Sequence, residues 1–183
     1  MKSPYRPEFE AALRLFARAS ESMKARGFAA PVLVGGAAVE LYSASAIATG
    51  DFDIATARQE EFEEELRELG FIRPSGPGKA TRGWIHPDLR LGFEVVTATL
   101  LDGMAERERV RLFSLDADGA AAVLSVEDII ADRVGQFASG TADDMLGQAR
   151  ILFSLFPDAD LEYLERRIRH ESSGDYGLEI LQA

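Results

Sequence analysis

The stretch VLVGGAAVELYSASAIATGDFDIAT, residues 32–56, decides the fold. An apolar run typical of a buried strand leads into Gly35 and Gly36 and then into an apolar segment of helical character. A second apolar run carries two acids one residue apart, Asp51 and Asp53. Burying two carboxylates so close together is unfavourable unless a positive group lies between them. The pattern therefore predicts a strand, a glycine turn, a helix and a second strand that needs a cation.

Composition limits the classes of protein to consider. The chain has 183 residues, of which 46% are hydrophobic, enough for one packed domain or a core domain with a small helical appendage. There is no cysteine, so disulfides, thiolate metal sites and a cysteine nucleophile are excluded. The net charge of -11 argues against broad binding to nucleic acid and suits a protein that collects divalent cations.

The sequence carries no sign of export or of membrane insertion. The first residues, MKSPYRPEFEAALRLF, lack the apolar core and the cleavage site of a signal peptide. No apolar run approaches the roughly 20 residues that span a bilayer. We therefore expect a soluble cytoplasmic protein without a membrane partner.

Hydrophobic periodicity predicts an α/β portion over residues 1–118 and a helical segment over residues 119–183. Residues 84–98 read as a hairpin in which Glu94 points away from its apolar neighbours. Ser125, followed three residues later by Asp128, is a typical start of a helix. The predicted fold is a small mixed sheet flanked by helices, followed by the helical C-terminal segment.

Alternation along the strands brings three acids to one face. Asp51 and Asp53 point the same way, roughly 7 Å apart along their strand. On a later strand, Glu94 likewise points away from its apolar neighbours. All three side chains offer oxygen ligands, which magnesium prefers. Three acids on adjacent strands would hold two metal ions that activate a hydroxyl and neutralise a leaving pyrophosphate. The glycine pair allows a triphosphate to approach the backbone at a helix N-terminus.

The combination of these features resembles the nucleotidyltransferase fold shared with DNA polymerase β. The signature there is Gly-Gly or Gly-Ser, a spacer, and Asp-hydrophobic-Asp; here it is Gly35-Gly36, fourteen intervening residues, and Asp51-Phe52-Asp53. The sequence is most similar to the minimal bacterial branch around the AbiEii and MenT toxin-type proteins, which LSVEDIIADRVGQF and ADDMLGQARIL also resemble. The resemblance covers roughly residues 30–155.

The resemblance implies roles for single residues. Gly35 and Gly36 would cradle the triphosphate, and Asp51 and Asp53 would bind both metal ions, Mg²⁺ or alternatively Mn²⁺. Glu94 would complete the metal site as the ligand on the side of the catalytic base.

Two residues of the helical segment also match the resemblance. Arg133 stands where toxin-type members have a lysine that contacts the triphosphate, and Asp144 falls near the acid of the next helix. The alternative for Arg133 is an ion pair with Glu127 or Asp128, or a side chain that reaches out to solvent.

The function implied is metal-dependent transfer of a nucleotide from an NTP to a hydroxyl acceptor on RNA, protein or a small molecule. A toxin–antitoxin component with a cognate antitoxin or small regulator fits this resemblance. The rival hypothesis is a non-catalytic nucleotide- or partner-binding member of the same fold, which the uncharged segment before Asp51 favours. Lys79, Arg82 and Arg90 could grip phosphate, but we expect such loop charges to be solvated.

Overall fold

The computed structural model describes residues 3–74, 83–89, 91–140 and 142–182. The chain forms two compact units. The first comprises residues 1–38 and 48–124, and the second comprises residues 39–47 and 125–183. No helix in the described ranges is long and apolar enough to cross a membrane.

A six-stranded mixed sheet forms the centre of the first unit, with the strand order β3-β4-β2-β1-β6-β5. β1 pairs in parallel with β6, and β2 in parallel with β4, whereas the other neighbours are antiparallel. The strands are β1 (Val32–Val34), β2 (Asp51–Ala55), β3 (Trp84–Ile85), β4 (Gly92–Thr97), β5 (Arg111–Ser114) and β6 (Ala120–Val123).

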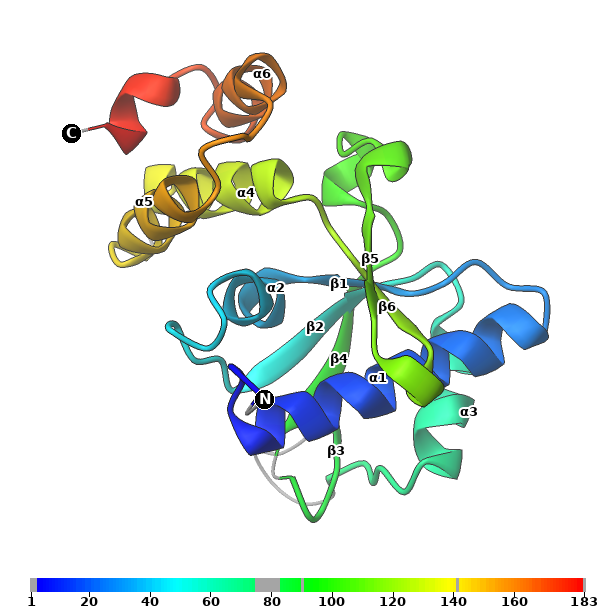
Figure 1. Ribbon diagram of the computed structural model, residues 1–183. Coiled ribbons are helices and arrows are strands. Elements are labelled where there is room, and N and C mark those ends of the chain that lie inside the picture. The colour runs from blue at the N-terminus through cyan, green and yellow to red at the C-terminus, as the bar shows by residue number, and fades with distance from the viewer. Residues whose placement is uncertain (1–2, 75–82, 90, 141, 183) are drawn as a thin grey trace. The chain divides into compact units, whose positions relative to one another are not determined.

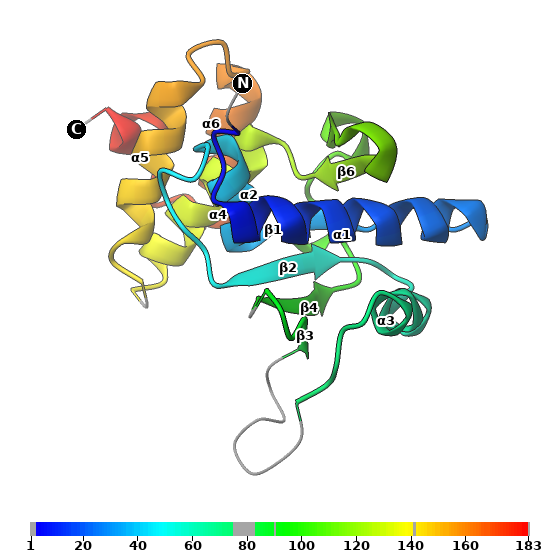
Figure 2. The same ribbon diagram turned by 60° about the horizontal axis from the view of Figure 1, so that its bottom comes forward.

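Helices α1 (Pro7–Ala25) and α3 (Gln59–Glu68) supply the apolar cover of this sheet (Figures 1 and 2). Alternation along β2 turns Phe52 toward α1, where its ring lies 5.3 Å from that of Phe9. Phe52 stacks at 4.6 Å on Phe93 of β4, and Phe93 in turn meets Phe16 of α1. The same alternation turns the acids of β2 toward the opposite face.

The remaining elements of the first unit are short. α2 (Gly35–Tyr42) begins directly after β1, and its later residues belong to the second unit. Three single turns of 3₁₀ helix connect the strands near the end of the unit: η1 (Leu101–Gly103), η2 (Arg107–Arg109) and η3 (Asp116–Asp118).

The second unit is helical, as the sequence predicted. α4 (Val126–Ala138) packs against α5 (Met145–Leu155) and α6 (Leu161–Glu171), and η4 (Leu178–Leu181) ends the chain (Figure 1). Ser125 caps α4 by accepting a hydrogen bond from the backbone N of Asp128 at 3.1 Å, which confirms the predicted helix start.

A charged group lies in the core of the second unit. Asp128 is 0% exposed and accepts hydrogen bonds from Ser125 Oγ at 2.7 Å, from Tyr163 Oη at 2.9 Å and from Arg167 Nε at 2.7 Å. Arg167 also donates to Glu171 at 2.6 Å. Burial alone would lower the pKa of the Arg167 guanidinium, but the bond and charge of Asp128, together with Glu171, raise it. We call these five residues the Asp128 cluster.

One strand was not predicted. β6, with the sequence AAAV, lies beyond residue 118 and inserts between β1 and β5. Alanine favours helices, so this segment carries no local strand signal, and its pairing with two neighbours decides its conformation. The predicted division of the chain into residues 1–118 and 119–183 stays a prediction.

Candidate metal and nucleotide site

Three carboxylates share one face of the sheet in the first unit. Asp53 on β2 is the register partner of Glu94 on the parallel strand β4, and Asp51 is the partner of Gly92. Register partners point to the same side of a sheet, and neighbouring strands lie roughly 4.8 Å apart. The backbone therefore places Glu94 beside Asp53, with Asp51 two residues away on the same face. We call Asp51, Asp53 and Glu94 the carboxylate face.

Glycines lie directly against all three of these acids, and a Cβ on Gly83 would lie 3.0 Å from Glu94 Cβ. Gly35, with φ of +59°, follows the residue that pairs with Asp53, and a Cβ on it would overlap the Asp53 carboxylate. A Cβ on Gly92 would come within 2.7 Å of Asp51 Oδ1. At Gly35 the approach requires glycine, because the backbone is left-handed and the Asp53 Cβ would also lie 3.0 Å from the added atom. At Gly92 the added Cβ would crowd only the carboxylate end of the exposed Asp51 side chain, which can turn aside. Gly92 was not predicted from the sequence, where its signal was a glycine inside an otherwise apolar strand.

Gly36 has a packing role of its own. A Cβ on Gly36 would lie 2.6 Å from Thr49 Oγ1, and this hydroxyl donates a 3.1 Å hydrogen bond to the backbone O of Asp51. The glycine pair therefore serves the packing of the turn before β2, whatever ligand it holds. Its predicted role as a triphosphate cradle stays a prediction.

A cation reaches this region from a distant part of the chain. Arg6, just before α1, donates from Nη2 to the backbone O of Thr49 at 2.9 Å and also contacts Glu8 at 3.3 Å. Arg6 was not predictable from the sequence, because 43 residues separate it from Thr49 and no local pattern links them. It brings a positive charge to the segment before Asp51, which has none of its own.

The acids of the carboxylate face differ in their surroundings. Asp51 and Glu94 are exposed, and within the described ranges no cationic side chain forms an ion pair with either. Asp53 is half-buried. Among the described residues, no three acidic or histidine side chains are grouped closely enough to hold a metal ion as they stand. The assignment of Asp51, Asp53 and Glu94 as metal ligands stays a prediction that rests on their shared face and register.

Arg133 lies inside the second unit. Its side chain is 6% exposed and donates to Asp132 Oδ2 at 2.6 Å and to Met145 Sδ at 3.1 Å. It pairs with neither Glu127 nor Asp128: Glu127 accepts the backbone N–H of Asp160, and Asp128 holds Arg167. The sequence correctly suggested an ion pair for Arg133, but the partner is Asp132 and not Glu127 or Asp128. Asp128 is unavailable because α4 turns it toward Arg167 of α6.

Asp144 precedes α5 and is exposed. Its carboxylate lies 3.5 Å from Gln148 Nε2, one helical turn on, and makes no cap to the helix N-terminus. The roles of Arg133 and Asp144 toward a nucleotide stay predictions. Lys79, Arg82 and Arg90 lie outside the described residues.

Comparison with known proteins identifies the fold. No protein-family model matches the chain, and no curated protein matches it in sequence. An antigenic nucleotidyltransferase-like protein from Paracoccidioides brasiliensis superposes with a TM-score of 0.61 at 15% identity, over 98% of this chain and 94% of that one. The antibiotic-resistance factor ANT(2'')-Ia superposes with a TM-score of 0.56 at 16% identity, over 89% of this chain and 92% of that one.

These superpositions confirm the predicted fold class, an α/β nucleotidyltransferase-like fold with a mixed sheet. They do not single out the AbiEii and MenT branch, so that finer assignment stays a prediction.

Proposed function

We propose that this protein transfers a nucleotide from an NTP to a hydroxyl acceptor, with Mg²⁺ or Mn²⁺ as cofactor. The observation that carries the proposal is the register of β2 and β4, which sets Glu94 beside Asp53 with Asp51 on the same face. Asp51 and Glu94 are exposed and have no cationic partner among the described residues, so their charge is available to a ligand.

The donor set suits a hard divalent cation. All three groups are carboxylates, and magnesium binds one or two carboxylates together with phosphate oxygens of the substrate. The spacing of neighbouring strands lets side-chain rotation alone bring the carboxylates of Asp53 and Glu94 together. Bound ions would activate the acceptor hydroxyl and neutralise the leaving pyrophosphate.

The chain's own residues bind and orient the reactants. The backbone N–H groups at the start of α2, beginning with Gly35 and Gly36, are the donors that a helix N-terminus offers to phosphate. In the transfer step the hydroxyl oxygen bonds to the α-phosphorus while the α–β anhydride bond breaks and pyrophosphate leaves. We assign the exposed Glu94 carboxylate as the base that takes up the proton of the attacking hydroxyl.

Among RNA, protein and small molecules as acceptors, we favour a small molecule. A net charge of -11 offers little basic surface for RNA. One of the two similar structures is an antibiotic-resistance factor, and a small-molecule acceptor would fit such a role. A role in a toxin–antitoxin pair, with a cognate antitoxin or small regulator, is the alternative under this activity.

The rival proposal is a non-catalytic protein that binds a nucleotide or a partner through the same fold. One observation favours it: the packing of Gly35 against Asp53 and of Gly36 against Thr49 explains the glycine pair without any ligand. The two proposals differ in whether pyrophosphate is released.

The test incubates the protein with each labelled NTP, with Mg²⁺ or Mn²⁺, and with cellular RNA, protein and small hydroxyl compounds in separate reactions. We expect label to move to one acceptor class and pyrophosphate to appear. Glu94→Gln should abolish transfer and retain NTP binding, because Asp51, Asp53 and the α2 backbone remain. Glu60→Gln, an exposed acid on α3, is the matched control and should keep full activity. NTP binding without pyrophosphate release under all conditions would establish the non-catalytic alternative.

A further inference from the structure

The first unit contains a hollow at the other end of β1 and β2 from the glycine pair. Its volume is about 200 Å³, and its walls are residues 27–30 before β1, residues 56–58 after β2, and Arg107 of η2. β1 and β2 are antiparallel, so these walls meet at one end of the strand pair while Gly35 and Asp51 lie at the other. The hollow therefore belongs to neither the carboxylate face nor the α2 N-terminus.

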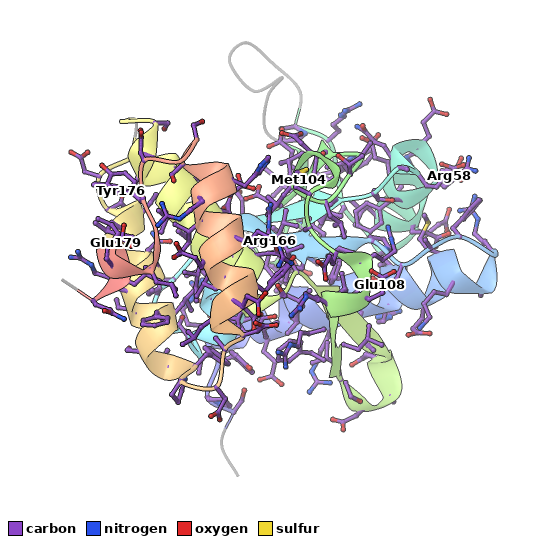
Figure 3. The ribbon with its side chains drawn as sticks, turned by 90° about the horizontal axis from the view of Figure 1, so that it is seen from above. Arg58, Met104, Glu108, Arg166, Tyr176 and Glu179 are labelled. Carbon is purple, nitrogen blue, oxygen red and sulfur yellow. The ribbon has the colours of Figure 1, made fainter. Side chains whose placement is uncertain are left out.

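Two arginines and no acid line this hollow. Within the described ranges the Arg107 side chain makes no ion pair or hydrogen bond. Its sequence neighbour Glu106 is engaged with Arg109 at 2.9 Å, and its other neighbour Glu108 is exposed (Figure 3). Other exposed arginines, such as Arg18 and Arg111, share this lack of a partner, but Arg107 alone of these three lines the hollow. Its N–H groups are donors available to a ligand there.

Arg58 lies at the second wall, beside the start of α3 (Figure 3). Its guanidinium lies 5.3 Å from the centre of the Phe28 ring, and its contact with Glu61 is long, at 3.4 Å. Arg26 packs on the same ring, also at 5.3 Å, and is itself neutralised by Glu64 and Glu65. The Arg58 side chain is 59% exposed apart from this ring contact, and most of its N–H donors stay unused and open to an anion.

Neutral donors complete the lining. Thr56 Oγ accepts a 3.1 Å hydrogen bond from the backbone N of Arg58, which leaves its own O–H to donate. The backbone N–H groups of Ala29 and Ala57 have no acceptor among the described residues. Donors from three separate segments therefore surround a hollow that lacks any carboxylate.

We propose that this hollow is a binding site for a small phosphate, either inorganic phosphate or the phosphate of a monoester. Arginine grips phosphate through paired N–H donors, and a phosphate group presents more oxygens to separated donors than a carboxylate does. A volume of about 200 Å³ is below the 300–1,000 Å³ of sites for drug-sized ligands, so the ligand is small. We call this hollow the arginine pocket, comprising residues 27–30, residues 56–58 and Arg107.

The test follows backbone amide resonances of the full chain by NMR during separate titrations with inorganic phosphate, methyl phosphate and acetate. We expect the amides of Ala29 and Ala57 to shift saturably with both phosphates and much less with acetate. The tighter of the two phosphates identifies the source, free phosphate or a monoester. The amides of Gly35 and Gly36 report separately on the proposed nucleotide site.

Arg107→Ala should weaken phosphate binding at Ala29 and Ala57 at least about tenfold, the worth of one charge-assisted hydrogen bond. Arg18→Ala removes the same charge from an exposed position on α1 and should leave the affinity unchanged. Asp51→Asn/Asp53→Asn should also leave the phosphate affinity unchanged. The test of the arginine pocket is therefore independent of the test of the proposed transfer activity. Shifts confined to Gly35 and Gly36, equal affinity in Arg107→Ala, or acetate binding as tight as phosphate would overturn the proposal.

Discussion

The Asp128 cluster and the carboxylate face put the same chemical group in opposite surroundings. Asp128 is fully buried, and every bond that stabilises its charge comes from the protein: a hydroxyl, a phenol and a guanidinium. Asp51 and Glu94 are exposed on a sheet face, without a cationic partner among the described residues. A buried carboxylate that the protein satisfies serves structure, whereas exposed carboxylates aligned by strand register are available to bind something else.

The largest effect on stability is expected in the Asp128 cluster. Arg167→Met leaves the buried Asp128 charge with only hydroxyl donors, and breaking a buried pair in this way typically costs about 3–5 kcal/mol. The free energy of unfolding in urea should fall by that amount. Arg167→Met/Asp128→Leu removes the second charge as well and should recover most of the loss. A single variant as stable as the wild type would show that Asp128 is not a structural acid.

The next effect concerns the glycine beside Asp53. Gly35→Ala combines a left-handed backbone, which costs an alanine about 1–2 kcal/mol, with a Cβ that collides with the Asp53 carboxylate, an overpacking worth about 1–3 kcal/mol. Gly27→Ala is the matched control, because Gly27 has φ of +84° and nothing within 4 Å of an added Cβ. Urea unfolding should show a larger loss for Gly35→Ala. Equal losses would mean that Asp53 yields easily and is not held by the turn.

A smaller effect separates two roles of Arg133. If its guanidinium serves the nucleotide, Arg133→Ala should weaken NTP binding by about 1.5–3 kcal/mol, the worth of a hydrogen bond to a charged group. Asp132→Asn breaks the 2.6 Å ion pair but keeps the guanidinium. Both variants should lose stability, and calorimetric titration should show weaker NTP binding in Arg133→Ala alone. Equal NTP affinity in the two variants would make Arg133 purely structural.

The sequence predicted the elements whose signals are local. The apolar run, glycine pair and Asp-x-Asp of residues 32–56 each act on neighbouring residues, and the observed β1, α2 and β2 follow them. Alternation also predicted that Glu94 points away from its apolar neighbours, whereas its place beside Asp53 depends on the pairing of β4 with β2. The helix start at Ser125 was predictable because the capping residue and Asp128 lie only three residues apart.

Features that depend on distant pairing were not predictable. Arg6 reaches Thr49 across 43 residues, and β6 becomes a strand through its pairing with β1 and β5. The partner of Arg133 was misassigned because helical spacing alone does not tell which acid forms an ion pair with a residue of another helix. These contacts are decided by the packing of elements far apart in sequence, which a single sequence does not encode in any local pattern.

The central claim is that Asp51 and Asp53 bind a divalent cation, and the most direct measurement is the thermal shift on adding it. Mg²⁺ should raise the melting temperature of the wild type and NTP with Mg²⁺ should raise it further, because a ligand at 100 times its Kd stabilises the native state by about 2.7 kcal/mol. Asp51→Asn/Asp53→Asn should lose most of both shifts and be no less stable without metal, since two repelling acids are removed. Glu60→Gln/Glu68→Gln, which removes two exposed acids of α3, should respond like the wild type. An unchanged response to Mg²⁺ in the Asp51→Asn/Asp53→Asn variant would place the cation elsewhere and contradict the claim.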